Sequence, residues 1–218
     1  MFLNIAAKVF LSVFLLVAQA FAVTSEVEKF DSNLVRGEGP FPYNYRIIDG
    51  HIHAGGHPFN PKTSFGNSDK QILSILNYLK AKGVKTIIDL DNTSRIQLRY
   101  KRLYREVGLE RFHLPLSSDR VPNAEEWEDL KEAMREPVYI HCTWGADRTG
   151  AVIAKYLVEE KGYSPKEAFE AVVTGGSHSG LFGGLKKISA NNKLIKFFWP
   201  DYTFTPIRKS GFNESTKK

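Results

Sequence analysis

Short apolar runs alternate with longer amphipathic segments along most of this chain, and that alternation constrains the fold more than any other feature. The apolar runs predict strands at residues 46–53 (broken by Gly50), 85–90, 111–116 and 138–141. The amphipathic segments predict helices at residues 69–82, 94–107, 124–135, 150–161, 165–173 and 186–198. Strands that alternate with helices favour a single α/β domain, with a mainly parallel central sheet flanked by helices.

The first 22 residues have the pattern of a secretory signal peptide. Lys8 precedes an apolar run at residues 9–17, and two small-x-small cleavage sequences end at Ala20 and Ala22. We therefore expect export to the periplasm or the medium, with an uncleaved N-terminal anchor as the alternative. The run is shorter than the roughly 20 residues of a membrane-spanning helix, so no stable span is expected after cleavage.

The remaining chain is expected to contain three parts. These are an irregular N-terminal segment at residues 23–44, a folded domain at residues 45–200, and a polar, basic tail at residues 201–218. The formal net charge of +6 is compatible with anionic substrates. Basic and aromatic residues do not form the stripe that is typical of nucleic-acid binding, so no nucleic-acid partner is expected. The oligomeric state is left open.

The chain has one cysteine, Cys142, in the sequence HCTWGADRTG at residues 141–150. This sequence follows a predicted strand and precedes a predicted helix. The amino end of a helix favours negative charge, and a cysteine placed there is held as the reactive thiolate. Gly145 allows successive backbone N–H groups to point inward as an anion-binding nest. Arg148 adds a planar fork that can grip two phosphate oxygens. The loop therefore has the groups needed to displace a leaving group from phosphorus.

This sequence resembles the His-Cys-x5-Arg-Ser/Thr signature of the cysteine-dependent protein tyrosine and dual-specificity phosphatases. The matching positions are His141, Cys142, Gly145, Arg148 and Thr149. The layout from about residue 45 to residue 173 is similar to small bacterial dual-specificity-like members, so the resemblance implies the cysteine phosphatase fold and makes residues 45–200 a phosphatase domain.

The resemblance also implies a role for each matched residue. Cys142 would attack phosphorus to form a phosphocysteine, Thr149 would help the thiolate leave, and His141 would orient the loop. The phosphoryl oxygens would be bound by Arg148 and by the loop residues Thr143, Trp144, Gly145, Ala146 and Asp147. The resemblance implies no metal and no cofactor.

The same resemblance implies an aspartate general acid in the loop after the preceding strand. Asp119, in the sequence SSDRVPN, occupies the matching loop, although its 23-residue separation from Cys142 is shorter than is usual in the family. Asp147 is the second candidate, because an aspartate directly before the arginine also resembles myotubularin- and Sac-type phosphoinositide phosphatases. Asp91 is the third. Asp147 is alternatively interpreted as a structural partner for a neighbouring donor.

Protein phosphotyrosine, with phosphoserine and phosphothreonine, is the first expected substrate class. A phosphoinositide or a soluble inositol phosphate is the alternative. The loop at residues 143–147 contains no lysine to neutralise several phosphates, which argues against a polyphosphorylated ring. A phosphate-binding pseudophosphatase is the hypothesis from another class, and the intact Cys142, Arg148 and Thr149 argue against it.

Two further stretches have alternative interpretations. The sequence DGHIHAGGHP at residues 49–58 resembles the metal-binding start of amidohydrolases, with His51 and His53 at strand spacing. That class needs a (β/α)8 barrel of roughly 250 residues, which this chain is too short to form. The glycine-rich sequence TGGSHSGLFGG at residues 174–184 is interpreted as a flexible connector, with a mobile lid as the alternative.

Overall fold

The structure is a computed structural model, and it describes residues 24–205. A six-stranded sheet in the order β1-β2-β3-β6-β4-β5 forms its centre. The strands are β1 (Val27–Lys29), β2 (Arg46–Ile48), β3 (Ile52–Gly55), β4 (Thr86–Asp89), β5 (Glu110–His113) and β6 (Val138–His141). The predicted signal peptide and residues 206–218 of the predicted tail lie outside the described residues.

The sheet is mainly parallel, which confirms the predicted α/β class. Strands β3, β6, β4 and β5 pair in parallel, while β1, β2 and β3 form two antiparallel pairs. The prediction that residues 23–44 are irregular was wrong at β1, which pairs with β2 along one edge of the sheet. This three-residue strand has an exposed Glu28 and Lys29, so it has no apolar periodicity by which the sequence could reveal it.

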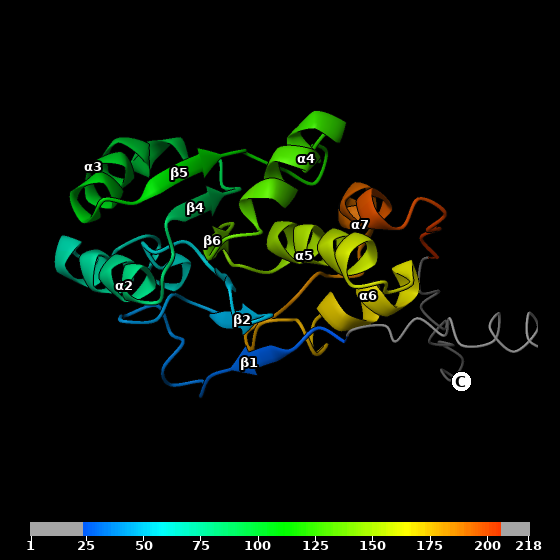
Figure 1. The fold of residues 1–218 in the computed structure, drawn as a ribbon, viewed down its shortest axis with the longest axis horizontal. Coiled ribbons are helices and arrows are strands. Elements are labelled where there is room, and N and C mark those ends of the chain that lie inside the picture. Colours follow the sequence, from blue (N-terminus) through cyan, green and yellow to red (C-terminus); the bar gives the residue numbers. More distant parts are fainter. Residues whose placement is uncertain (1–23, 206–218) are drawn as a thin grey trace, which may run out of the picture.

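Six α-helices lie on the two faces of the sheet, counted within residues 24–205 and labelled as in Figure 1, from α2. They are α2 (Asp69–Ala81), α3 (Gln97–Val107), α4 (Ala124–Ala133), α5 (Asp147–Glu160), α6 (Pro165–Val172) and α7 (Asn192–Phe198), with a 3-10 turn (Ser189–Asn191) before α7. No helix among the described residues has the length and apolar character needed to cross a bilayer.

Side chains that alternate along the strands form a separate core on each face of the sheet. Ile87 and Tyr139 pack with α2 and α3, whereas their neighbours Ile88 and Ile140 pack with α5, α6 and α7. Figure 1 shows the same division, with α2 and α3 on one side of the sheet and α5, α6 and α7 on the other. Because successive strand residues point to opposite faces, both cores form from continuous apolar runs.

The predicted helices are present, but several of their ends differ from the prediction. Ser68 and Ser164 form capping boxes, so α2 and α6 start where the sequence indicated. Helix α5 begins at Asp147, three residues before the predicted start, and only residues 192–198 of the predicted C-terminal helix are α-helical. The early start of α5 places Arg148 and Thr149 in its first turn, next to the end of β6.

The parallel strands end together at one edge of the sheet. Gly55 of β3 and Asp89 of β4 are each paired in register with His141 of β6. The chain then continues from His141 through residues 142–146 into α5. Ligands of α/β sheets bind at this carboxyl edge, and it is where the sequence motif is located.

Candidate active site

The loop between β6 and α5, residues 142–146, is called the cysteine loop below. Cys142 begins it, is 2% exposed, and lies at the end of a fully buried strand. Ala146 is the N-cap of α5, so the unpaired N–H groups of the first helical turn face the same region. The structure therefore places Cys142 beside a helix amino end, as the sequence indicated.

Three successive carbonyl groups of the cysteine loop are held from outside it. The N–H of His57 donates to the Thr143 carbonyl (3.0 Å), and Asn44 Nδ2 donates to the Trp144 carbonyl (3.2 Å). Arg46 Nη1 donates to the Gly145 carbonyl (3.0 Å). In a trans peptide the following N–H points to the opposite side. The N–H groups of residues 144, 145 and 146 are thus turned away from these donors, which is the arrangement of an anion-binding nest.

Gly145 is required at its position by both conformation and space. Its φ of 67° lies in the left-handed region, which favours glycine. A Cβ at this position would lie 2.2 Å from the carbonyl carbon of Gly55. The turn after β3, residues 55–57, therefore packs directly beneath the cysteine loop. Gly55 and Gly56 of the DGHIHAGGHP sequence have this supporting role.

Arg148 connects three parts of the site through one guanidinium group. Nη2 donates to Thr143 Oγ1 (2.6 Å), and Nη1 lies 3.2 Å from Asp91 Oδ1. Nη1 also contacts the carbonyls of Leu90 (3.1 Å) and Leu116 (3.3 Å). Leu116 lies three residues before Asp119, so Arg148 links the cysteine loop to the base of the Asp119 loop.

Three aspartates were candidates for the general acid, and the structure gives each a different environment. Asp147 Oδ1 accepts hydrogen bonds from Lys186 N (2.8 Å) and Asn191 Nδ2 (2.6 Å), which ties α5 to the segment before α7. Asp119 is exposed, and no other residue between 24 and 205 donates a hydrogen bond to its carboxylate. Asp147 thus has the contacts of a structural partner, whereas the Asp119 carboxylate is exposed and accepts no hydrogen bond from the described residues.

Asp91, the third candidate, is fully buried beside Arg148. Burial alone would raise the pKa of its carboxyl group. Hydrogen bonds from Thr93 and Thr143, together with the Arg148 charge, instead lower that pKa to about 2. A carboxylate that stays ionised at neutral pH is a poor proton donor. Its position fits the orientation of Arg148 better than it fits acid catalysis.

His141 is fully buried, and its two ring nitrogens contact different parts of the site. Nδ1 lies 3.3 Å from the Cys142 carbonyl, and Nε2 lies 3.0 Å from the Tyr100 hydroxyl. Burial lowers the pKa of His141, so the ring is neutral at neutral pH. The contact with the Cys142 carbonyl supports the orienting role that the sequence predicts for His141, and that role stays a prediction.

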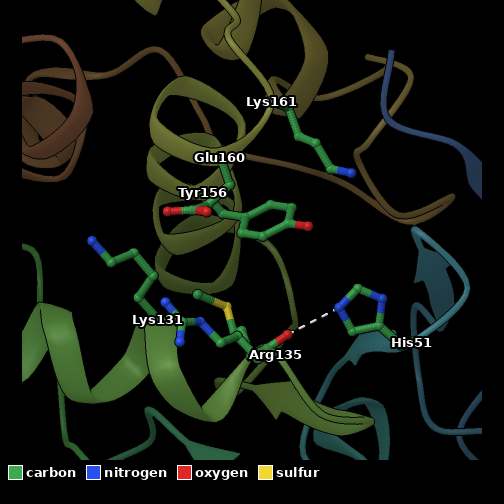
Figure 2. Close-up of a pocket in the computed structure, with 7 residues that line it drawn as sticks. His51, Lys131, Arg135, Tyr156, Glu160 and Lys161 are labelled. Atoms are coloured by element: carbon green, nitrogen blue, oxygen red, sulfur yellow. Dashed lines mark hydrogen bonds between the residues drawn. The ribbon is translucent and has the colours of Figure 1, made fainter. Parts of the chain in front are cut away.

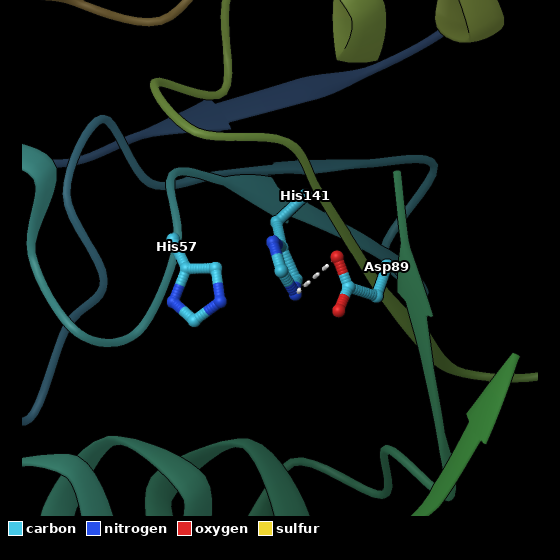
Figure 3. A group of neighbouring side chains, drawn as sticks. All are labelled: His57, Asp89 and His141. Atoms are coloured by element: carbon cyan, nitrogen blue, oxygen red, sulfur yellow. Dashed lines mark ion pairs between the residues drawn. The ribbon is translucent and has the colours of Figure 1, made fainter. Parts of the chain in front are cut away.

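His141 also lies between His57 and Asp89 in a buried cluster (Figure 3). The ligand atoms of these three residues lie within 4.8 Å of one another, which is a spacing that a metal ion could use. However, Arg111 Nε donates to Asp89 Oδ2 (2.9 Å), and the Tyr100 hydroxyl already contacts His141 Nε2. A neighbouring guanidinium opposes a bound cation, so we interpret the cluster as polar support for His141.

Thr149 is fully buried in the first turn of α5. Its Oγ1 has no hydrogen-bond partner among the described residues, and the structure does not bring it within hydrogen-bonding distance of Cys142 Sγ. The predicted assistance to the leaving thiolate therefore stays a prediction. A buried hydroxyl without a partner is unfavourable, so Thr149 retains an unused hydrogen-bond donor.

Residues 65–162, which include the cysteine loop and Arg148, match a protein family described as "Polymorphic toxin system, DSP-PTPase phosphatase". A 95-residue stretch is 32% identical to a tyrosine-protein phosphatase of Autographa californica nuclear polyhedrosis virus, and it covers 40% of this chain and 55% of the viral protein. Both similarities agree with the resemblance of the sequence motif to the cysteine-dependent protein tyrosine and dual-specificity phosphatases. The chain spans about half of the length of this viral relative.

Two solved structures share the fold over most of this chain. The crystal structure of P. aeruginosa TpbA has a TM-score of 0.53 and 20% identity, covering 78% of this chain and 88% of its own. The core catalytic domain of the PP-IP phosphatase SIW14 from S. cerevisiae has a TM-score of 0.51 and 18% identity, covering 73% and 88%. Both similarities concern the fold, and they agree with the cysteine phosphatase fold expected from the sequence.

An aromatic surface borders the cysteine loop. Trp144 is 46% exposed and meets the ring of Tyr43 edge-on, with centroids 5.6 Å apart. Tyr43 in turn stacks on Phe182, with centroids 4.9 Å apart. Phe182 belongs to the glycine-rich segment at residues 174–184. Sequence analysis did not group these three rings, because they come from separate parts of the chain.

A pocket lies at the edge of the sheet where the parallel strands begin, opposite the edge that carries Cys142. Figure 2 shows His51 and Arg135, which precede β3 and β6, among the residues that line it. Its basic side chains already pair with carboxylates, namely Lys131 with Glu128, Arg135 with Glu132 and Lys161 with Asp49. His51 lines this pocket and uses its ring nitrogens on the carbonyls of Asp49 and Met134. His53 instead contacts the Tyr45 hydroxyl (2.5 Å). The two histidines of the metal-like sequence therefore do not form one site.

Sequence analysis missed the residues that hold the cysteine loop from outside. Asn44 and Arg46 lie about one hundred residues before the loop, and no local pattern connects them with it. Both also contact the glycine-rich segment, through the Gly183 carbonyl and the His178 carbonyl respectively. That segment is therefore fixed to the site at these points by hydrogen bonds.

Proposed function

We propose that this chain is a phosphomonoester hydrolase that acts through a phosphocysteine intermediate, with protein phosphotyrosine as its main substrate class and phosphoserine and phosphothreonine as further substrates. The observation that supports it most is the cysteine loop. Cys142 begins a loop whose three central carbonyls are held outward, while Arg148 lies at the amino end of the adjoining helix. Preorganised N–H donors of this kind stabilise the charge that develops on phosphoryl oxygens.

In the first step the Cys142 thiolate attacks phosphorus and the bond from phosphorus to the ester oxygen breaks. Asp119 donates its proton to that oxygen, so the substrate leaves as a neutral alcohol or phenol. Arg148 and the loop N–H groups bind the three phosphoryl oxygens. The uncommitted carboxylate of Asp119, and the link from Arg148 to Leu116 at the base of its loop, support this assignment.

In the second step the phosphocysteine is hydrolysed. The Asp119 carboxylate takes a proton from water, the resulting hydroxide attacks phosphorus, and the sulfur–phosphorus bond breaks. The products are inorganic phosphate and the Cys142 thiolate, and Asp119 is protonated again for the next turnover. Thr149, whose buried hydroxyl lacks a protein partner, would donate to the departing thiolate.

The aromatic surface favours an aryl phosphate over an inositol phosphate. Trp144 projects from the cysteine loop beside Tyr43 and Phe182, and aromatic rings prefer stacked or edge-to-face contacts with a further ring. The loop also contains no lysine. Asp147, the residue that resembles the phosphoinositide enzymes, is tied to Lys186 and Asn191. A phosphoinositide or soluble inositol phosphate remains the alternative substrate class.

Hydrolysis of a substrate panel tests this proposal. The panel contains phosphotyrosine peptides, phosphoserine and phosphothreonine peptides, phosphoinositides and soluble inositol phosphates, with Cys142→Ser as the matched inactive control. We expect the highest kcat/KM for phosphotyrosine peptides, and a selective loss for these peptides in Trp144→Ala. A higher kcat/KM for an inositol substrate would reassign the substrate class. Phosphate binding without turnover of any panel member would identify a pseudophosphatase.

We also propose that the chain is exported and that its leader is removed after Ala22. The support is the sequence pattern of residues 1–22. Cell fractionation of the full chain with a C-terminal tag, followed by N-terminal mass analysis, tests this. We expect the protein outside the cytoplasm with an N-terminus at Val23, and full-length protein in the membrane fraction would favour the uncleaved anchor.

A further inference from the structure

Arg46 in β2 carries a guanidinium group but is only 1% exposed. The hydrogen bonds that it donates go to backbone carbonyls, and its Nη2 has no hydrogen-bond partner among the described residues. Nε donates to His178 O (2.8 Å), and Nη1 donates to Asn44 O (3.2 Å) and Gly145 O (3.0 Å). Among the ion pairs formed by residues 24–205, none includes Arg46. Burying a charge without a counter-charge is strongly unfavourable, so this arginine requires an explanation.

Cys142 begins the loop whose Gly145 carbonyl Arg46 binds, and it is itself buried, so its thiolate can balance this buried charge. Burial lowers the pKa of Arg46 to about 10, and the negative charge of Cys142 opposes that lowering. The guanidinium is therefore still a cation at neutral pH. The other titratable groups around it do not supply an anion. Burial raises the pKa of Tyr139 well above its usual range and lowers that of His178 to about 4, and Lys29 is a base.

Arg46 also acts on the geometry of the cysteine loop. Its bond to the Gly145 carbonyl holds that oxygen on the outer side, which turns the Ala146 N–H to the inner side of the same peptide plane. Gly145 has the left-handed φ of 67°, a conformation that no helix or strand hydrogen bond maintains. The guanidinium is thus the shorter of two donors to the Gly145 carbonyl, the other being Asn44 Nδ2 at 3.5 Å, and it holds the last peptide of the cysteine loop.

We propose that Arg46 is a positioning residue of the phosphatase site, which holds the Gly145 peptide in its anion-binding orientation and is the buried counter-cation of the Cys142 thiolate. The part of this inference that concerns catalysis rests on the proposed function. Arg46 also binds the carbonyl of His178, so the same side chain joins the glycine-rich segment to the cysteine loop.

Two substitutions separate the charge of Arg46 from its hydrogen bonds. Arg46→Met removes both, whereas Arg46→Lys keeps the charge but cannot reach three carbonyls at once. The readouts are kcat/KM for p-nitrophenyl phosphate and the pH dependence of Cys142 alkylation by iodoacetate, which reacts with the thiolate. Arg135→Met is the matched control, because it removes the same charge from an exposed position at the opposite edge of the sheet.

For Arg46→Met we expect the midpoint of alkylation to rise by about one pH unit, and kcat/KM to fall by about 100-fold, as when an oxyanion donor is removed. For Arg46→Lys we expect an unchanged midpoint with a kcat/KM that is about tenfold lower. Arg135→Met should match wild type in both readouts.

Wild-type values of the midpoint and of kcat/KM in a folded Arg46→Met would overturn the proposal. If Arg46→Met does not fold, the kcat/KM and the alkylation midpoint of Arg46→Lys test the proposal. A wild-type kcat/KM would then overturn the positioning role, and a raised midpoint would overturn the role of the charge. If the wild-type protein hydrolyses no phosphomonoester, the proposed function fails, but the alkylation midpoints still test the link between Arg46 and Cys142.

Discussion

At the scale of single residues, the environments of the three aspartates separate their roles. Asp91 is buried against Arg148 with its pKa lowered to about 2, so it stays ionised and orients the guanidinium. Asp147 accepts two hydrogen bonds from the segment that leads to α7. Asp119 is exposed on the loop whose base Arg148 contacts. Only the last of these carboxyl groups can approach a substrate without breaking contacts within the protein.

Asp119→Asn tests the proton donor. An amide cannot protonate the leaving group, so hydrolysis of alkyl phosphates should fall by about 100-fold or more. p-Nitrophenyl phosphate should be affected far less, because its phenolate leaves almost unaided. The measurement is kcat for both substrates in wild type and variant. Equal losses on the two substrates would show that Asp119 does not donate the proton.

At the scale of secondary-structure elements, the early start of α5 is important. Because the helix begins at Asp147, Arg148 and Thr149 are fixed by the first helical turn instead of by a flexible loop. The Asp147 carboxylate then joins this turn to Lys186 and Asn191, near the start of α7. The position of Arg148 therefore depends on contacts between α5 and the C-terminal part of the fold.

Asp147→Ala should consequently affect stability more than chemistry. Removing the carboxylate leaves a backbone N–H and a side-chain amide without their acceptor, which should lower the free energy of unfolding by about 1–3 kcal/mol. Urea denaturation measures that loss. Any decrease in kcat should be the same for alkyl and p-nitrophenyl phosphates. A loss confined to alkyl phosphates would instead make Asp147 the general acid.

The cysteine loop and its flanking strand and helix could be predicted because their residues are contiguous. Cys142, Gly145 and Arg148 form one local pattern, and the alternation of apolar runs indicates the sheet around it. Asn44, Arg46 and His57 could not be predicted as its supports, because only the neighbouring positions of β2, β3 and β6 bring them to the loop. Strand β1 was missed because three residues with exposed charged side chains give no periodic signal.

At the scale of the whole molecule, buried histidines couple stability to pH. Burial lowers the pKa of His53 to about 4, of His57 to about 3 and of His178 to about 4, from an ordinary value of 6.5. As the pH falls below 6.5, the unfolded chain takes up protons that the folded protein does not bind. Stability is therefore full above about pH 6.5 and decreases toward pH 4.

Urea denaturation between pH 7 and pH 4.5 measures this dependence. Each such histidine contributes a slope of up to about 1.4 kcal/mol per pH unit. Replacing one of them in His178→Gln should make the decrease shallower. The depressed pKa of Asp91 adds to the loss only below its ordinary value of 3.8. A free energy of unfolding that is constant from pH 7 to pH 5 would contradict the assignment of neutral buried histidines.

The most direct measurement is the location of the phosphoryl group during turnover. Wild-type protein is mixed with p-nitrophenyl phosphate, denatured within milliseconds and analysed by peptide mass spectrometry, with Cys142→Ser as the control. We predict a phosphoryl group on the peptide that contains Cys142, and a folded Cys142→Ser variant without phosphoenzyme or turnover, because a serine hydroxyl is not ionised at neutral pH. A phosphoryl group on another residue, or turnover by Cys142→Ser above about one hundredth of wild type, would contradict the phosphocysteine mechanism.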